Sequence, residues 1–246
     1  MTAHKSRGVV YVLCGSRDLD NGHLGNSISS VRKYIGDIDI NVWSDIDIPD
    51  LGQDHVTKYK TVNFDERRGN RNSSLFRLHA LKKSAFRNTL YLDNDVYVVN
   101  RFINNGFDIA ENFGIAMAQN PRRFIFAPTD DRTASPMGDL DIGADVGPMD
   151  LGALREMPRG MTALNMGVIF YNSKSSSFLD CIIDEQEFMP SRGQASLARA
   201  IWRKKTSPYA LCENWLVCRS EVKCETPIAV HAGHPEVKLW WERELK

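Results

Sequence analysis

The sequence predicts an α/β fold, in which a mixed, mostly parallel central sheet is flanked by helices within a single domain. Strand-like β-branched and aromatic runs alternate with segments of helical periodicity over about the first 100 residues, in the order β-α-β-β-α-β. The length of 246 residues suits one large domain. We therefore expect one domain over 1–246, with a first half over about 1–100 and a second half over about 101–246.

The elements of the first half follow from local patterns. An apolar strand over 9–15 ends in the small polar turn CGSRD. A helix over 22–35 follows, because apolar residues recur there at helical spacing. We also expect strands over 39–47 and 55–64, a polar loop over 65–74, a helix over 75–86 and a fourth strand over 90–92.

The second half is less regular. Residues 127–160 are rich in Pro, Gly and Asp and show little periodicity, so we interpret them as a long loop on the substrate side. A strand over 162–173 carries a polar break at Asn165. The other expected elements are helices near 107–113, 176–187 and 191–204, and strands over 114–118 and 227–234.

Composition narrows the class of protein. Thirty-one basic and 31 acidic residues cancel, so the chain has no overall charge to attract nucleic acid or an anionic membrane. No apolar run is long enough to cross a bilayer, and the first one, Val9–Cys14, is too short for a secretory leader. Five Cys in no zinc-binding spacing indicate free thiols and a reducing, cytoplasmic location.

The stretch TLYLDNDVYVVN places two carboxylates directly after an apolar strand. Asp93 and Asp95 would be costly to bury unpaired. In a mostly parallel sheet, ligands bind at the carboxyl ends of the strands, and CGSRD and DND both lie at such ends. Two carboxylates at this position, with no basic residue beside them, suit Mg²⁺ or Mn²⁺. The alternative is an Asx-type hairpin or bulge with solvated carboxylates.

LYLDNDVYV resembles the aspartate motif of the GT-A glycosyltransferases, in particular the retaining, glycogenin-like and galactosyltransferase-like group. FRLHALKKS places Arg77 where that group carries an Arg in a helix, and LNMGVIFYNS aligns Asn165 and Gly167 with an N-x-G element. GQASL, with Gln194, and VHAGHPEVKLW, near the C-terminus, are similar to two further elements. The five elements occur in the order found in the family.

The resemblance implies a GT-A domain that moves a sugar from a nucleoside diphosphate, with UDP as the expected nucleotide, to a glycan or other hydroxyl acceptor with retention. The first half would bind the nucleotide, and the second half would face the acceptor. The cofactor would be Mn²⁺ or Mg²⁺, held by Asp93, Asp95 and His231, with Asp95 the more direct ligand. Gln194 and Asn165 would be catalytic. The implied donor-binding residues are Leu13, Cys14, Gly15, Arg77, Asn94 and Lys238.

The sequence also departs from the family pattern. Gly193 and Ala195 replace two acidic residues of the fourth element, so the acceptor carboxylates could instead come from the Asp-rich loop. His234 is an alternative to His231 as the metal or diphosphate ligand, because the spacing of the last element is shifted. Two other functions stay open: a nucleotidyltransferase that makes the sugar nucleotide, and a non-catalytic module that binds a metal or a glycan.

Overall fold

The computed structural model describes residues 5–59, 69–124, 162–188, 194–217 and 226–231. Seven strands of this part form one sheet, in the order β3-β2-β1-β4-β7-β6-β8. Neighbouring strands from β3 to β4 are parallel, and β8 is parallel to β6, whereas β7 is antiparallel to both of its neighbours. The strands are β1 (Lys5–Leu13), β2 (Asp39–Ser44), β3 (His55–Lys58), β4 (Phe86–Leu92), β6 (Ile115–Phe124), β7 (Thr162–Asn172) and β8 (Tyr209–Leu211).

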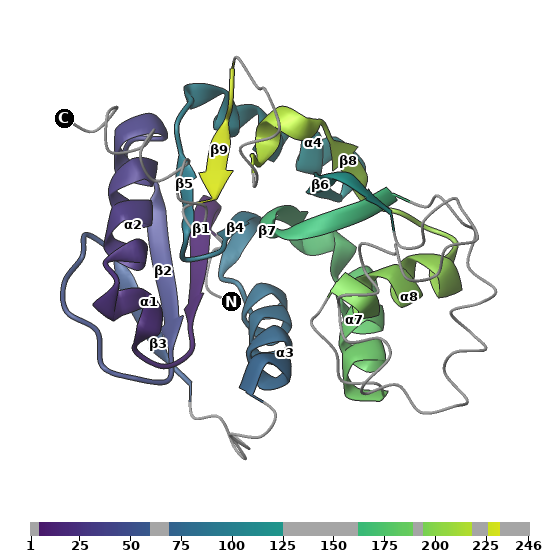
Figure 1. Ribbon diagram of the computed structural model, residues 1–246, viewed down its shortest axis with the longest axis horizontal. Helices are drawn as coiled ribbons and strands as arrows, with labels where there is room; N and C mark the ends of the chain where they lie inside the picture. The colour runs from purple at the N-terminus through teal and green to yellow at the C-terminus, as the bar shows by residue number, and fades with distance from the viewer. Residues whose placement is uncertain (1–4, 60–68, 125–161, 189–193, 218–225, 232–246) are drawn as a thin grey trace.

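Helices cover both faces of this sheet (Figure 1). Successive side chains of a strand point to opposite faces, so Val9 and Tyr11 of β1 join one buried cluster while Val10 and Val12 join another. The first cluster includes α2 (His23–Tyr34) and α4 (Asn105–Phe113). The second includes α3 (Gly69–Lys82), α7 (Ser176–Phe188) and α8 (Gln194–Lys204).

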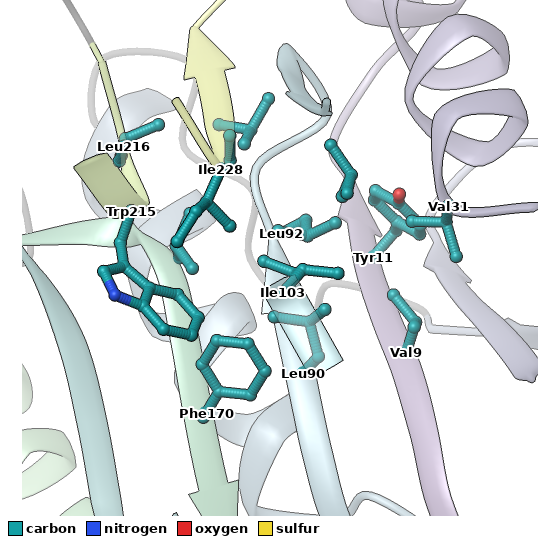
Figure 2. Packing of buried hydrophobic residues seen from close by; sticks show 14 of the residues in the cluster. Val9, Tyr11, Val31, Leu90, Leu92, Ile103, Phe170, Trp215, Leu216 and Ile228 are labelled. Atoms are coloured by element: carbon teal, nitrogen blue, oxygen red, sulfur yellow. The ribbon is translucent and has the colours of Figure 1, made fainter. Parts of the chain in front are cut away.

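The first cluster extends from β1 across the sheet to the C-terminal part of the chain. Figure 2 shows Val9 and Tyr11 beside Val31 at one end and Trp215 at the other. Phe170 of β7 packs edge-on against Trp215, with ring centroids 5.6 Å apart. Burying side chains of this size contributes roughly 1.5–3 kcal/mol each, so the cluster ties both halves of the chain to one sheet.

A second, smaller sheet joins distant segments. It pairs β5 (Val96–Val98) with β9 (Ala229–His231) in antiparallel register, and Val96 faces His231. The other edge of β5 hydrogen-bonds to α2: Ser27 Oγ donates to the Val96 carbonyl at 2.5 Å, and the Val98 N–H donates to Ser30 Oγ at 2.9 Å. Both edges of this short strand are therefore satisfied, which fixes the turn that precedes it.

The sequence predicted the fold class and most of its elements. The α/β class with a mixed, mostly parallel sheet is confirmed, as are the helix over 22–35 and the apolar strand that ends before Asp93. Several short elements were not predicted: α1 (Arg17–Asp20), β8 and the 3₁₀ turns Arg101–Asn104, Ser173–Ser175 and Glu213–Trp215. The long loop over 127–160 lies outside the described residues.

Two expected boundaries around α3 are wrong. The polar loop predicted over 65–74 contains the start of α3 at Gly69, and the helix ends at Lys82 rather than near Phe86. Phe86 is instead the first residue of β4, where it pairs with Lys5 of β1. A Cβ at Gly8 would come within 2.4 Å of the Phe86 ring, so the ring occupies the space that this glycine leaves. Tertiary packing therefore overrides the helical pattern here.

Two further findings concern the expected location. Cys14, Cys181 and Cys212 are free thiols, whereas Cys218 and Cys224 lie outside the described residues. In the ranges that the structure describes, no helix combines the length and the apolar character needed to span a membrane.

Candidate functional site

The candidate site lies where the strand order reverses. The chain passes from β1 to β2 and β3 on one side of β1, and then returns to place β4 on the other side. The carboxyl ends of β1 and β4 are therefore neighbours at a topological switch point, where open α/β sheets bind their ligands. β4 ends at Leu92, so Asp93 is the first residue beyond the strand, and β1 ends at Leu13 on the same edge.

Asp93, Asn94 and Asp95 form a tight turn between β4 and β5. The Val96 N–H donates to the Asp93 carbonyl at 3.0 Å, which closes the turn, and Asn and Asp are common in such turns. The two carboxylates are partly enclosed, however, because the Asp93 and Asp95 side chains are only 25% and 28% exposed, with Arg77 beside Asp93 and His231 beside Asp95. The backbone does form a turn, but β4 and β5 belong to different sheets, so the turn does not close a hairpin.

Asp93 is held on one oxygen by two side chains. Arg77 of α3 places Nη2 3.0 Å from Asp93 Oδ1, and the Tyr91 hydroxyl donates to the same oxygen at 2.5 Å. Arg77 also lies over the Tyr91 ring, with its guanidinium carbon 5.2 Å from the centroid. The predicted helix thus brings Arg77 into direct contact with Asp93, the first residue after the predicted strand.

The protonation states of Arg77 and Tyr91 follow from their burial and from the charges beside them. Burial by itself would lower the pKa of Arg77, but the Asp93 carboxylate and other nearby groups raise it, and the net effect is a raised pKa. Arg77 is therefore charged at neutral pH. Burial also raises the pKa of Tyr91 well above its ordinary value, so its hydroxyl keeps the proton that it donates to Asp93.

Asp95 is paired with His231, at the end of the second small sheet. His231 Nε2 lies 3.2 Å from Asp95 Oδ2. Burial raises the pKa of Asp95, His231 opposes that shift, and the carboxylates of Asp93 and Asp18 reinforce it. Asp93 and Asp18 thus place two further carboxylates near Asp95.

The N-x-G element of β7 lies against Asp93. The Asp93 N–H donates to the Gly167 carbonyl at 2.9 Å, and the Gly167 N–H donates to Asn165 Oδ1 at 2.7 Å. A Cβ on Gly167 would meet Asn165 Oδ1 at 3.0 Å and Asp93 Oδ2 at 3.1 Å. The register of β6 against β7 shifts between Met117 and Ala118, opposite this element. Such irregularities are common beside functional sites, where they redirect side chains.

The Asn94 side chain turns away from Asp93 and Asp95 and toward β1. Asn94 is only 7% exposed, and Nδ2 donates to the Val12 carbonyl and to Asp18 Oδ2, each at 3.0 Å. Its amide therefore fastens the turn to β1 and to α1. The predicted donor contact of Asn94 would have to use Oδ1, which is buried and has no hydrogen-bond partner among the described residues.

The predicted nucleoside residues lie at the end of β1. The Leu13 side chain is fully buried in the core, so it offers a ligand no more than its backbone. Burial and the nearby Asp45 carboxylate raise the pKa of the Cys14 thiol to about 12, which makes Cys14 a poor nucleophile. Gly15 has φ +70°, and its N–H donates to Asp45 Oδ1 at 2.9 Å.

The structure does not describe the side chains of some predicted site residues. Gln194 is the first residue of α8, but its side chain is outside the described part, as are His234 and Lys238. Sequence reasoning missed Tyr91, Asp18 and Asp45. Tyr91 could have been found, because residues i and i+2 of a strand share a face. No sequence signal links Asp18 to Asn94, which is far from it along the chain.

The donor set fits a hard divalent cation. Asp95 and His231 supply a carboxylate oxygen and an imidazole nitrogen, which Mn²⁺ accepts. Over the described ranges, no three His, Cys, Asp or Glu side chains are grouped so that they could hold a metal by themselves. Mg²⁺ and Mn²⁺ at phosphate sites commonly use one or two protein ligands and complete their shell with water and phosphate oxygens. Asp95 and His231 could therefore hold a cation only together with water or ligand oxygens.

A separate hollow of about 500 Å³ lies at the opposite edge of the sheet. It is lined by residues at the amino ends of β1 and β2, among them Ser6, Arg7 and Asp39. Arg7 is already paired with Asp108 of α4. None of the predicted site residues lines this hollow, so it does not compete with the site at the carboxyl edge.

Comparisons with known proteins leave the family open. No model of a known protein family matches the chain, and no curated protein sequence matches it.

Proposed function

We propose that the chain is a metal-dependent glycosyltransferase of the GT-A type, which moves a sugar from a nucleoside diphosphate, with UDP as the nucleotide, to a hydroxyl acceptor. One observation carries the proposal. The Asp93–Asp95 turn lies at the switch point of the sheet, and three distant segments bring Arg77, Gly167 and His231 to it. These are the positions at which the sequence resembles the family.

Each residue has a role that its surroundings support. Asp95 and His231 would hold the cation, because they are adjacent and enclosed. A bound Mn²⁺ or Mg²⁺ would neutralise the leaving diphosphate as a Lewis acid. Arg77 supplies a fixed positive charge beside Asp93 and would attract the donor. The end of β1, which Asn94 links to the turn, would contact the nucleoside.

Retention of anomeric configuration belongs to the same proposal. It is supported by the resemblance of the Asn165, Gln194 and His231 elements to the retaining group. A role for Asn165 close to the reacting sugar is supported by its nearness to Asp93, because a Cβ on Gly167 would contact both Asn165 Oδ1 and Asp93 Oδ2. An inverting enzyme would instead need a general base within reach of the acceptor hydroxyl.

The first experiment is calorimetric titration with UDP, with and without Mn²⁺, on the wild type and on Asp95→Ala. We expect micromolar binding that requires Mn²⁺ and is lost in Asp95→Ala. Asp108→Ala is the matched control, because this exposed carboxylate lies on α4 and pairs with Arg7 near the other edge of the sheet. Binding of GDP or dTDP in place of UDP would change the donor and keep the reaction class. Binding of none of the three would refute the proposal.

Turnover then separates the competing functions. Release of UDP from a UDP-sugar in the presence of a hydroxyl acceptor supports a transferase. A nucleotidyltransferase would instead release pyrophosphate from a nucleoside triphosphate and a sugar phosphate. Metal-dependent binding of a nucleotide without either product would indicate a binding module.

A further inference from the structure

We propose that Tyr91 is a positioning residue for the donor site, acting through Asp93. This inference rests on the proposed function and assigns a role to a residue that the resemblance does not. Tyr91 lies in β4, two residues before Asp93, and its side chain is 2% exposed. Its hydroxyl therefore cannot reach a ligand directly, but it reaches the carboxylate that can.

The geometry selects one oxygen of Asp93. The Tyr91 hydroxyl donates to Oδ1 at 2.5 Å, and Arg77 Nη2 lies 3.0 Å from the same atom. Oδ2 lies near Gly167, where an added Cβ would meet it at 3.1 Å. Two donors on Oδ1 fix the carboxylate plane and leave Oδ2 as the oxygen for a ligand.

Tyr91 also contacts Arg77 directly. The Arg77 guanidinium lies over the Tyr91 ring at 5.2 Å, so the ring supports the cation while the hydroxyl holds the carboxylate. Phe at this position would keep the ring and its packing and remove only the donor. Asp93 would then be held by Arg77 alone and would be free to rotate about its side-chain bonds.

The test is Tyr91→Phe, with Tyr171→Phe as the matched control. Tyr171 lies on the neighbouring strand β7, is also 2% exposed and belongs to the same buried cluster. Within the described residues, its hydroxyl makes one long hydrogen bond, of 3.4 Å, to the Ser173 carbonyl. We expect Mn²⁺-dependent UDP binding to weaken about ten-fold in Tyr91→Phe, by loss of a hydrogen bond to a charged group, and to stay unchanged in Tyr171→Phe.

A double-mutant cycle separates positioning from a structural role. Tyr91→Phe is introduced again in an Asp93→Ala background, which has no acceptor for the hydroxyl, and both UDP affinity and the urea midpoint of unfolding are measured. If Tyr91 acts through Asp93, Tyr91→Phe changes neither the affinity nor the midpoint much further in that background. Equal weakening of binding in both backgrounds, or no weakening in the wild-type background, overturns the inference. The unfolding measurement reports the contact even where Asp93→Ala abolishes binding.

Failure of the proposed function gives a different result. Wild-type protein that binds none of UDP, GDP and dTDP refutes the nucleotide site, and the positioning role falls with it. Wild-type protein that binds UDP while Tyr91→Phe binds it equally well refutes the positioning role alone.

Discussion

His231 Nε2 lies 3.2 Å from Asp95 Oδ2, although more than half of the chain separates the two residues. The antiparallel pairing of β5 with β9 produces this contact, because it places Val96 opposite His231. Each of the two side chains is about 30% exposed, so the pair is reachable from solvent and still partly shielded. This arrangement is suited to a cation that arrives together with its ligand.

Replacing His231 should therefore weaken metal-dependent binding. We expect His231→Ala to lower the affinity for UDP in Mn²⁺ by at least about ten-fold, the lower end of the range seen when groups around a metal are removed. His55→Ala is the control, since His55 is near Asp39 at the amino edge of the sheet. Calorimetry checks both variants. Unchanged affinity in His231→Ala would exclude the imidazole from the metal site.

Gly167→Ala tests the crowding beside Asp93. The new Cβ would approach Asn165 Oδ1 and Asp93 Oδ2 at 3.0 and 3.1 Å, closer than ordinary contact, so one of them must move. We expect a loss of about 1–3 kcal/mol in the free energy of unfolding, as for other overpacked sites, and weaker UDP binding in Mn²⁺.

The matched control for this change is Gly25→Ala in α2. Its Cβ would meet only Leu51 Cδ2, at 3.7 Å. Helical Gly→Ala should stabilise the protein by about 0.5–1 kcal/mol and leave UDP binding unchanged. Urea unfolding and calorimetry measure the two properties. A Gly167→Ala variant that binds UDP as well as Gly25→Ala would show that Asp93 and Asn165 tolerate the methyl group.

A buried ion pair between α7 and α8 should be sensitive to removal of one partner. Arg199 Nε lies 3.1 Å from Glu185 Oε2, and the two side chains are 7% and 1% exposed. Arg199→Met leaves the Glu185 carboxylate enclosed, so we expect a loss of about 3–5 kcal/mol in the free energy of unfolding. Arg203 also contacts Glu185, at 2.9 Å, but is 63% exposed, and Arg203→Met should cost less than about 1 kcal/mol. Similar losses from both changes would contradict this distinction.

Asp54 should make stability depend on pH in the acid range. Partial burial would raise its pKa, but hydrogen bonds from the Ile40 N–H and from Arg32, both 2.7 Å long, lower the pKa below 3.8 overall. The native state then favours the ionised carboxylate, so its contribution is present above pH 3.8 and is lost as the pH falls through the lowered value.

For Asp54→Asn we expect a loss of about 0.5–1 kcal/mol at pH 7, because the side chain is 37% exposed and solvent screens its ion pair. The loss should shrink as the pH is lowered. Asp50→Asn is the control, since Asp50 Oδ1 accepts from the Gly52 N–H within its own turn. Thermal unfolding at several pH values measures both variants. A loss independent of pH would assign the effect to packing rather than charge.

The parts of the fold that were predictable are those with strong local patterns. The spacing of Leu24, Ile28 and Val31 is that of a one-sided helix, and all three are fully buried in α2. The start of α3 was missed because GNRNSS has no apolar residue, so nothing in it distinguishes a helix from a loop. β8 was missed because a three-residue strand has no measurable periodicity and depends on pairing with β6.

The site was predictable only in part, for a related reason. The Asp93–Asp95 turn is encoded locally by the change from apolar to acidic residues. The contacts that give it chemical character come from Arg77 of α3, Gly167 of β7 and His231 of β9, and their positions followed from the resemblance rather than from local pattern. The link from Asn94 to Asp18 needed the three-dimensional structure.

The small β5–β9 sheet has a consequence for the order of assembly. Its two strands are remote in sequence, so closing it has a high entropic cost until the seven-stranded sheet holds β5 in place. During synthesis, the segment that carries His231 emerges after nearly all of the strands and helices. The imidazole would then be among the last groups to reach the site, and partly made chains would have the carboxylates without the full means to trap a cation.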